Sequence, residues 1–268
     1  MARFDFKRFY FEFGHFREDL KIRQICGRNQ RIVISFRHKN KSMYKAFITD
    51  VDGTLTDGRR RLSTKAVEEI RRLIDADIPI VLASGNTLCF LDCLSHMIGT
   101  DGNVIAENGG VFRKGFLGKR TVAGDRALCM QAYEKIREAV QPKGDELRLF
   151  SSELRNSDVA FSRDVSIEQV NAIIKGMDVV AVDTGFAIHL HTPGLSKGAA
   201  FAALAKEMGL SPSEFVAAGD SVNDVSMLKL AGFSIVPANG TADAKDAASV
   251  VLDEPYGDAV AKALAEYF

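Results

Sequence analysis

Hydrophobic and polar positions follow a regular order between Tyr44 and Asn108. Short runs that are apolar throughout, such as "IPIVLAS", alternate with longer segments in which apolar residues recur every three or four positions. The first pattern is typical of strands buried on both faces, and the second of helices that pack one face on a sheet. Strands that alternate with helices indicate right-handed βαβ units and a parallel sheet. The predicted order is strand 44–50, a helix capped by Ser63, strand 78–84, helix 87–98 and strand 103–108.

The order changes between Gly110 and Pro193. Residues 109–122, "GGVFRKGFLGKRTV", place glycines between short apolar runs, which indicates a hairpin. Helices are predicted near 126–140 and 167–175. Two helices among several short strands indicate a small α+β unit inserted into the sheet domain. The predicted strands of this unit are 146–152, 158–164, 178–185 and 186–193.

After Pro193 the first order returns, with apolar strands that alternate with helices to the end of the chain. The predicted fold class is therefore α/β: a doubly wound parallel-sheet, Rossmann-like core with an inserted α+β cap domain. We expect the core at 43–122 plus 194–268 and the cap at 123–193. The helices predicted after Pro193 are 196–208, 222–231, 241–247 and 257–267, and the strands are 214–220, 233–239 and 249–252.

Charge is distributed unevenly along the 268 residues, although the formal net charge is zero. Residues 1–42 hold 11 Lys and Arg against 4 Asp and Glu, so the remainder carries a net charge of −7. This basic arm also holds 7 of the 18 Phe, and aromatic residues among arginines could stack on single-stranded nucleic acid. We expect instead a poorly ordered extension or a mis-assigned start, because Met43 directly precedes the first clear strand. The acidic remainder argues against nonspecific nucleic-acid binding by the core.

The four cysteines, Cys26, Cys89, Cys93 and Cys129, form no CxxC pair, and nothing indicates a disulfide framework. Cys89, Cys93 and His96 would share one helical face, but they lack a fourth zinc ligand. We expect these cysteines to pack their helix on the sheet as small buried residues. No apolar run reaches 18 residues, and the N-terminus lacks an apolar core of signal-peptide type. We expect no membrane partner and a cytoplasmic location.

Polar clusters follow four predicted core strands. Carboxyl ends of parallel strands meet at one edge of the sheet, where ligands bind in this fold class. Four carboxylates in one crevice need a cation to offset their charge, and an all-oxygen donor set indicates Mg²⁺ rather than zinc. A magnesium ion beside a lysine and a serine suits a phosphate dianion. The clusters are Asp50 with Asp52, Ser84-Gly85-Asn86, Asn108-Gly109-Gly110 and Asp220 to Asp224, with Lys197 at the start of a helix along the same edge.

Four motifs occur in one order along the chain: D-x-D-G-T-L at 50–55, hydrophobic-Ser-Gly at 83–85, Ser-Lys-Gly at 196–198 and G-D-x-x-N-D at 219–224. The set resembles the haloacid dehalogenase-like (HAD) phosphohydrolases over all of 43–268. The stretch "AENGG" at 106–110 and the position of the inserted unit are similar to the Cof-type branch with a C2 cap. Within that branch "VLASGN", the compact cap and "EPYGDAV" look most like archaeal phosphoglycolate phosphatases.

The resemblance implies a Mg²⁺-dependent phosphomonoester hydrolase with an aspartyl-phosphate intermediate. Asp50 would be the nucleophile, and Asp52 would protonate the leaving alkoxide and then activate water. Ser84 and the Gly85 amide would bind the phosphate, while Lys197 would stabilise the transition state. Thr54 would position the nucleophile, and Asn86 would bind phosphate or shape a turn. The implied metal residues are Asp50, Asp52 through its backbone carbonyl, Asp220, and Asp224 as a ligand or through a metal-bound water.

The implied substrate is a small phosphorylated metabolite, 2-phosphoglycolate. Its carboxylate needs a donor beyond Lys197, and a cap arginine can bind a carboxylate bidentately. Two cap histidines, His189 and His191, could touch substrate, but we expect packed or solvent-facing side chains. The arginines that we consider are Arg148, Arg155 and Arg163.

Other hypotheses stay open at this point. The same chemistry would serve a sugar-phosphate or mannosyl-phosphoglycerate phosphatase, and a phosphomutase would use the same aspartyl-phosphate. A different class, a nucleic-acid-associated protein acting through the basic arm, predicts salt-sensitive binding. The sequence leaves monomer and homodimer open.

Overall fold

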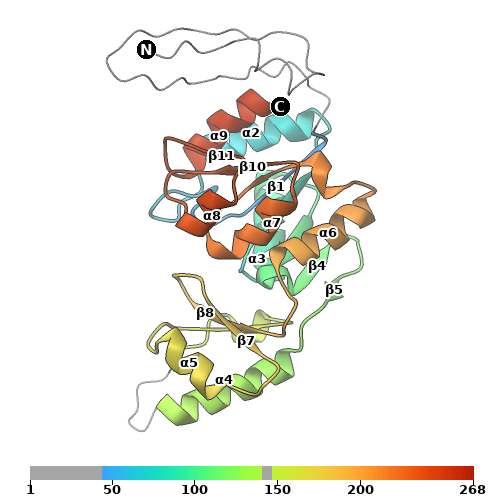
Figure 1. Cartoon of the computed structure of the whole chain (residues 1–268). Coiled ribbons are helices and arrows are strands. Elements are labelled where there is room, and N and C mark those ends of the chain that lie inside the picture. Colours follow the sequence, from blue (N-terminus) through green and yellow to red (C-terminus); the bar gives the residue numbers. More distant parts are fainter. Residues whose placement is uncertain (1–43, 141–146) are drawn as a thin grey trace, which may run out of the picture. The chain divides into compact units, whose positions relative to one another are not determined.

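The computed structural model describes residues 44–140 and 147–268 (Figure 1). The predicted extension at 1–42, with Cys26, lies outside the described residues. The predicted α/β class is confirmed, and its elements form two separate sheets. The smaller sheet belongs to the inserted segment 123–193, which we call the cap.

The larger sheet has eight strands. Six neighbouring strands are parallel to one another, and the two strands at one edge are added through antiparallel pairs. The central strand has a parallel partner on each side, so three carboxyl ends lie next to one another at the same edge. The order across the sheet is β11 (Val250–Val251), β10 (Phe233–Val236), β9 (Phe215–Ala218), β1 (Ala46–Thr49), β2 (Ile80–Ala83), β3 (Asn103–Ala106), β4 (Val111–Arg113) and β5 (Thr121–Val122).

Helices cover both faces of this sheet (Figure 1). Side chains alternate along β1, so Phe47 enters one hydrophobic cluster while Ala46 and Ile48 enter the other. This burial on two faces explains why the strands are apolar throughout. In the described part of the chain, no helix combines the length and apolarity needed to cross a membrane. The first cluster includes α2 (Thr64–Asp75), α3 (Leu88–Ile98) and α9 (Tyr256–Tyr267), and the second α6 (Lys197–Met208), α7 (Val225–Leu230) and α8 (Ala242–Asp246).

The cap has its own hydrophobic cluster around Phe161. Its antiparallel sheet packs against two helices, which account for the 3.6-residue spacing of apolar residues in the sequence. The predicted strand at 146–152 is wrong: Leu149 makes one isolated bridge, and Ser152–Leu154 form a 3-10 turn. Ser151 has φ 51°, which breaks an extended backbone. The elements are α4 (Arg126–Val140), β6 (Val159–Phe161), α5 (Ile167–Ile173), β7 (Val180–Asp183) and β8 (Ile188–His191).

Three further expectations from the sequence need correction. Cys89 and Cys93 are exposed rather than packed on the sheet, because the buried face of α3 is set by Leu88, Leu91, Ser95 and Ile98. The predicted strand 103–108 ends early, and Glu107–Gly109 form a 3-10 turn that becomes part of the site. The predicted helix 222–231 is likewise divided into a 3-10 turn at Val222–Asp224 and α7.

Candidate active site

Three neighbouring strands of the large sheet end in polar residues. Asp50 follows β1 directly, Ser84 follows β2, and Asp220 comes two residues after β9. Backbone hydrogen bonds continue the sheet through the first two, from Asp50 N to Ala218 O at 2.9 Å and from Ser84 N to Ile105 O at 2.8 Å. The topology therefore brings together side chains that lie up to 170 positions apart (50 to 220) in the sequence.

Lys197 lies fully buried between two carboxylates. Its Nζ donates to Asp50 Oδ1 and to Asp224 Oδ1, each at 2.6 Å. Burial alone would lower the pKa of this lysine, but the two carboxylates outweigh it and raise the pKa above its usual value. The first turn of a helix disfavours a cation, so the carboxylates stabilise Lys197 against both burial and the helix dipole.

Asp50, Asp220 and Asp224 form an acidic cluster, with one carboxylate oxygen of each within 4.8 Å of the others. Burial raises the pKa of Asp50 well above its usual range, although the charge of Lys197 lowers it. Burial and then the charge of Asp224 raise the pKa of Asp220 to about 7. One lysine cannot offset three carboxylates, so the cluster has the excess negative charge and the all-oxygen donors that a hard divalent cation requires.

The two oxygens of Asp224 are already occupied by protein donors. Oδ1 accepts from Lys197, and Oδ2 accepts the backbone amides of Asp220 at 3.1 Å and Ser221 at 3.0 Å. This side chain therefore holds the lysine and closes the turn that carries Asp220.

Asp220 has side-chain partners of its own. Thr54 Oγ1 donates to Asp220 Oδ1 at 3.0 Å, so this hydroxyl holds Asp220 and not, as the sequence predicts, the nucleophile. Asn239 Nδ2 contacts Asp220 Oδ2 at 3.3 Å and Gly53 O at 2.9 Å. Asn239 was not predicted, yet it too ends a stretch that follows a core strand, β10.

Gly53 is required by the closeness of Asp220. Its φ is 85°, and a Cβ at this position would lie 2.3 Å from Asp220 Oδ2. Any other residue would be strained and would displace the carboxylate. The glycine after the Asp-x-Asp pair thus shapes the acidic cluster directly.

Asp52 lies outside the acidic cluster, on the side of the loop after β2. Its Oδ2 accepts from Asn86 Nδ2 at 2.8 Å. Ser84 Oγ accepts the amide of Asn86 at 3.1 Å and its Nδ2 at 3.2 Å, which leaves the serine hydroxyl proton to donate elsewhere. Asn86 therefore links the two predicted active-site loops.

The strained turn Glu107–Gly109 donates hydrogen bonds to the loop after β2. Glu107 and Asn108 have φ of 52° and 54°, which is rare outside glycine. Glu107 N donates to Asn86 O at 2.9 Å and Asn108 N to Ser84 O at 3.2 Å. Asn108 Oδ1 accepts from Asn223 at 2.8 Å, so the turn also reaches the last motif.

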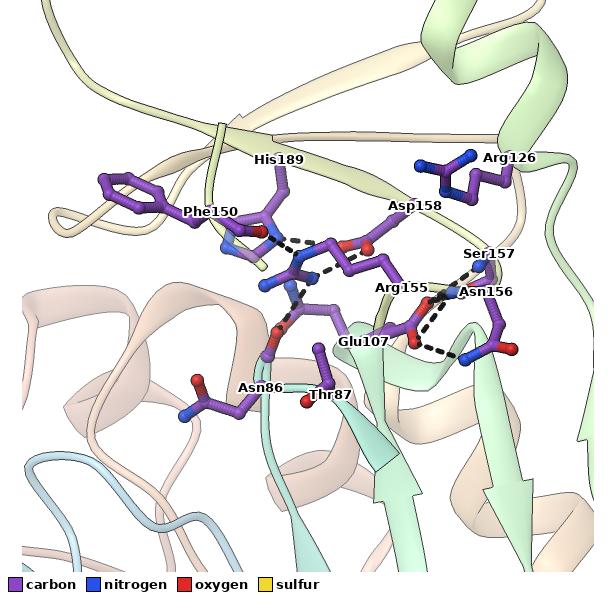
Figure 2. A network of polar contacts seen from close by, with 12 residues as sticks. Asn86, Thr87, Glu107, Arg126, Phe150, Arg155, Asn156, Ser157, Asp158 and His189 are labelled. Carbon is purple, nitrogen blue, oxygen red and sulfur yellow. Dashed lines mark hydrogen bonds and ion pairs between the residues drawn. The ribbon is translucent and has the colours of Figure 1, made fainter. Parts of the chain in front are cut away.

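The side chain of Glu107 points into the cap, where it accepts hydrogen bonds from Asn156 and Ser157 (Figure 2). The sequence contains "AENGG", but its composition does not reveal that the carboxylate binds the inserted unit.

The cap arginines and histidines differ in their surroundings. Arg163 is exposed and pairs with Asp183, while Arg148 lies over the ring of Phe150 at 5.3 Å. Arg155 is buried and contacts the core. His189 is a packed side chain, as expected, and its Nδ1 lies 2.9 Å from Asp158 Oδ2. The Nδ1 atom of His191 contacts Thr192 O.

The chain matches the haloacid dehalogenase-like hydrolases over residues 47–154 and 158–264. It belongs to this family. It is 50% identical over 228 residues to a protein named phosphoglycolate phosphatase from Methanoculleus marisnigri, with 84% of this chain and 97% of the relative covered. A protein of the same name from Methanospirillum hungatei is 43% identical over 226 residues, with the same coverage of 84% and 97%.

Solved structures agree with the family. The crystal structure of Thermoplasma acidophilum 0175 superposes with a TM-score of 0.74 at 28% identity, covering 84% of this chain and 98% of the other. A haloacid dehalogenase-like hydrolase from Bacteroides thetaiotaomicron gives a TM-score of 0.68 at 20% identity over 84% of this chain and all of the other, and shows the shared fold alone. The chain is thus a hydrolase of this family, with its acidic cluster at the carboxyl ends of β1 and β9.

Proposed function

We propose that the chain is a Mg²⁺-dependent phosphomonoesterase and that its substrate is 2-phosphoglycolate. The observation that carries the chemistry is the buried Lys197 bridging Asp50 and Asp224, because it leaves one oxygen of Asp50 unused beside a positive charge. The choice of substrate is supported by relatives named phosphoglycolate phosphatase, up to 50% identical to this chain.

In the first step Asp50 Oδ2 attacks phosphorus. Among the described residues this oxygen has no hydrogen-bond partner, whereas Oδ1 is held by Lys197. A bond forms between Asp50 and phosphorus as the bond from phosphorus to the glycolate oxygen breaks. Asp52 gives its proton to that oxygen, so glycolate leaves as the alcohol and Asp50 carries the phosphoryl group.

In the second step Asp52, now a carboxylate, takes a proton from water. The water oxygen bonds to phosphorus, the bond to Asp50 breaks, and inorganic phosphate leaves. Asn86, which donates to Asp52 Oδ2 at 2.8 Å, would keep this carboxylate oriented through both steps.

Ser84, the Gly85 amide and Lys197 would hold the phosphate. Hydroxyl and amide donors bind phosphate oxygens, and a buried ammonium offsets the charge that develops during transfer. Thr54 and Asn239 would keep Asp220 in place.

The acidic cluster fits Mg²⁺ by charge and donor type. Asp50 and Asp220 would hold it through their carboxylates and Asp52 through its backbone carbonyl. Asp224, whose oxygens accept from Lys197 and from two backbone amides of the Asp220 turn, would position both. When bound, Mg²⁺ supplies positive charge to the phosphate and to the nucleophile's carboxylate.

Phosphate release from a panel of esters tests the proposal. With Mg²⁺ present, 2-phosphoglycolate should have the highest kcat/KM among phosphoglycolate, sugar phosphates, mannosyl-phosphoglycerate and nucleotides, and EDTA should abolish turnover. A higher kcat/KM for a sugar phosphate or for mannosyl-phosphoglycerate would mean that this ester, and not 2-phosphoglycolate, is the substrate. Transfer of the phosphoryl group to a second sugar hydroxyl instead of water would indicate a phosphomutase. Turnover that is unaffected by EDTA would contradict the metal requirement.

A further inference from the structure

Arg155 is the cap arginine that contacts the core loop predicted to bind phosphate. Its side chain is buried, with 8% of the residue exposed. Nε donates to Phe150 O at 3.0 Å, and Nη1 donates to Asp158 Oδ1 at 2.7 Å and to Gly85 O at 3.2 Å. Figure 2 shows the guanidinium between the cap residues Phe150 and His189 and the core residue Asn86. Its position is therefore fixed from both sides of the junction between cap and core.

The charge of Arg155 is balanced by a buried carboxylate that has a partner on each of its two oxygens. Asp158 is almost completely buried, with one oxygen on Arg155 and the other on His189 Nδ1 at 2.9 Å. Although burial raises the pKa of Asp158, His189 and Arg155 outweigh it and lower the pKa. An ionised carboxylate that is itself held by two hydrogen bonds keeps the guanidinium in one orientation.

One donor group of Arg155 is left over. Nη2 has no hydrogen-bond partner among the described residues, and it is not sealed from solvent. It carries two N–H donors in the plane of the guanidinium. A fixed arginine with an open donor pair beside a phosphate loop is prepared to bind a second anionic group of the same ligand, because its side chain is already ordered.

The other two arginines considered from the sequence, Arg148 and Arg163, lack this arrangement. Arg163 is exposed, and its Nε and Nη2 donate to Asp183 while its Nη1 donates to Gly185 O. Arg148 lies over the ring of Phe150, and no side-chain hydrogen bond ties it to the described part of the core. Neither side chain donates a hydrogen bond to Gly85 or Asn86, whereas Arg155 donates one to Gly85 O.

Glu107 fixes the segment that carries Arg155. The next two residues, Asn156 and Ser157, donate their backbone amides to the Glu107 carboxylate at 3.0 Å and 2.7 Å. Ser157 also packs against Gly110, where a Cβ would lie 2.0 Å from its Oγ. The buried Glu107 carboxylate of the core thus fixes the position of Arg155 relative to Gly85.

We propose that Arg155 determines substrate specificity by binding the substrate's carboxylate through Nη2, with Asp158 and Glu107 as positioning residues. This inference rests on the proposed function. In 2-phosphoglycolate only the ester oxygen and one carbon separate phosphorus from the carboxylate carbon. A guanidinium that touches Gly85 is therefore within reach of the carboxylate while the phosphate occupies the Ser84–Gly85 loop.

Steady-state kinetics of Arg155→Lys with two substrates test the proposal. The substrates are 2-phosphoglycolate and 2-hydroxyethyl phosphate, which has a neutral tail of similar size. We expect kcat/KM for phosphoglycolate to fall about ten- to hundredfold, and that for the neutral ester to change less than about threefold. Arg163→Lys is the matched control, since it makes the same change in an exposed cap arginine, and both of its kcat/KM values should stay at the wild-type level.

Three other results would overturn the inference. Equal losses with both substrates would mean that Arg155 acts on the core loop through Gly85, and no loss with either would mean that it touches no substrate. If the wild-type chain itself fails to prefer phosphoglycolate, the proposed substrate is wrong and the inference falls with it. The wild-type ratio thus separates failure of the proposed function from failure of the role of Arg155.

A second measurement keeps Arg155 intact and does not depend on the folding of its variants. In a crystal structure of Asp50→Asn protein with 2-phosphoglycolate, the carboxylate should lie at hydrogen-bond distance, about 3 Å, from Arg155 Nη2. A carboxylate bound to any other side chain, with Arg155 Nη2 unoccupied, would overturn the proposal.

Discussion

The carboxylate of Glu107 accepts two hydrogen bonds from Ser157, one from its backbone amide at 2.7 Å and one from its hydroxyl at 2.6 Å. Both residues are buried, Glu107 in the strained turn after β3 and Ser157 in the cap. Donors aimed at an ionised carboxylate form strong hydrogen bonds. The strained backbone of the core is thus used to hold a cap segment beside the active site.

Glu107→Gln should loosen this junction. The glutamine amide nitrogen would face N–H donors, so at least one buried amide loses its acceptor, at a cost of about 1–3 kcal/mol in the free energy of unfolding. Chemical denaturation measures that loss, and kcat/KM for phosphoglycolate should fall with it. Glu138→Gln, an exposed change on α4, is the control and should leave both unchanged. Wild-type stability in Glu107→Gln would show that the junction does not depend on this carboxylate.

Asp224→Asn separates a positioning role from metal ligation. Since Asp224 holds Lys197 at 2.6 Å, the loss of its charge should lower kcat about ten- to hundredfold. The Mg²⁺ concentration for half-maximal activity should stay within about threefold of the wild-type value, while Asp220→Asn should raise it far more. A titration of activity with Mg²⁺ gives both numbers. Equal weakening in the two variants would make Asp224 a ligand.

Asp220 gives the metal-free protein a dependence on pH of defined sign. Its folded-state pKa of about 7 lies above the ordinary value of 3.8, so between these values the folded state binds more protons than the unfolded state. Stability from this group is therefore lost as pH rises from about 4 to about 7. In EDTA, the unfolding temperature of Asp220→Asn relative to wild type should increase over this range. The idea fails if that difference is independent of pH.

The same charge predicts how Mg²⁺ stabilises the fold. A cation binds the ionised carboxylates, so added Mg²⁺ should raise the unfolding temperature of the wild-type chain more at about pH 8 than at about pH 5. Asp220→Asn should lose most of this shift. Thermal unfolding with and without Mg²⁺ at the two pH values checks both statements.

The sequence contained enough information for the sheet and for the positions of the motif residues. Continuous apolar runs mark strands buried on both faces, and parallel strands leave their polar ends at one edge, so Asp50, Ser84 and Asp220 had to converge. The helix N-cap at Ser63 was also readable, and its side chain accepts from the first turn as expected.

Contacts that depend on loop conformation could not be read in this way. The positive φ of Glu107 and Ser151 shorten one predicted strand and remove another, and neither residue type demands such a conformation. The Arg155–Asp158–His189 group joins a turn to a distant strand, and no periodicity records that pairing. The cysteines of α3 lie at helical spacing, but the larger leucines decide which face is buried.

The central claim, that Asp50 carries the phosphoryl group, can be tested by trapping the intermediate. Asp52→Asn should still form it from an ester with a good leaving group, such as p-nitrophenyl phosphate, but should hydrolyse it slowly because the general base is missing. Protein quenched in acid during turnover is digested, and the peptide spanning 46–59 is sequenced by mass spectrometry. The account predicts a phosphoryl group on Asp50, absent when Asp50→Asn is added to the variant. A phosphoryl group on another residue would contradict it, as would release of p-nitrophenolate in amounts unaffected by Asp50→Asn.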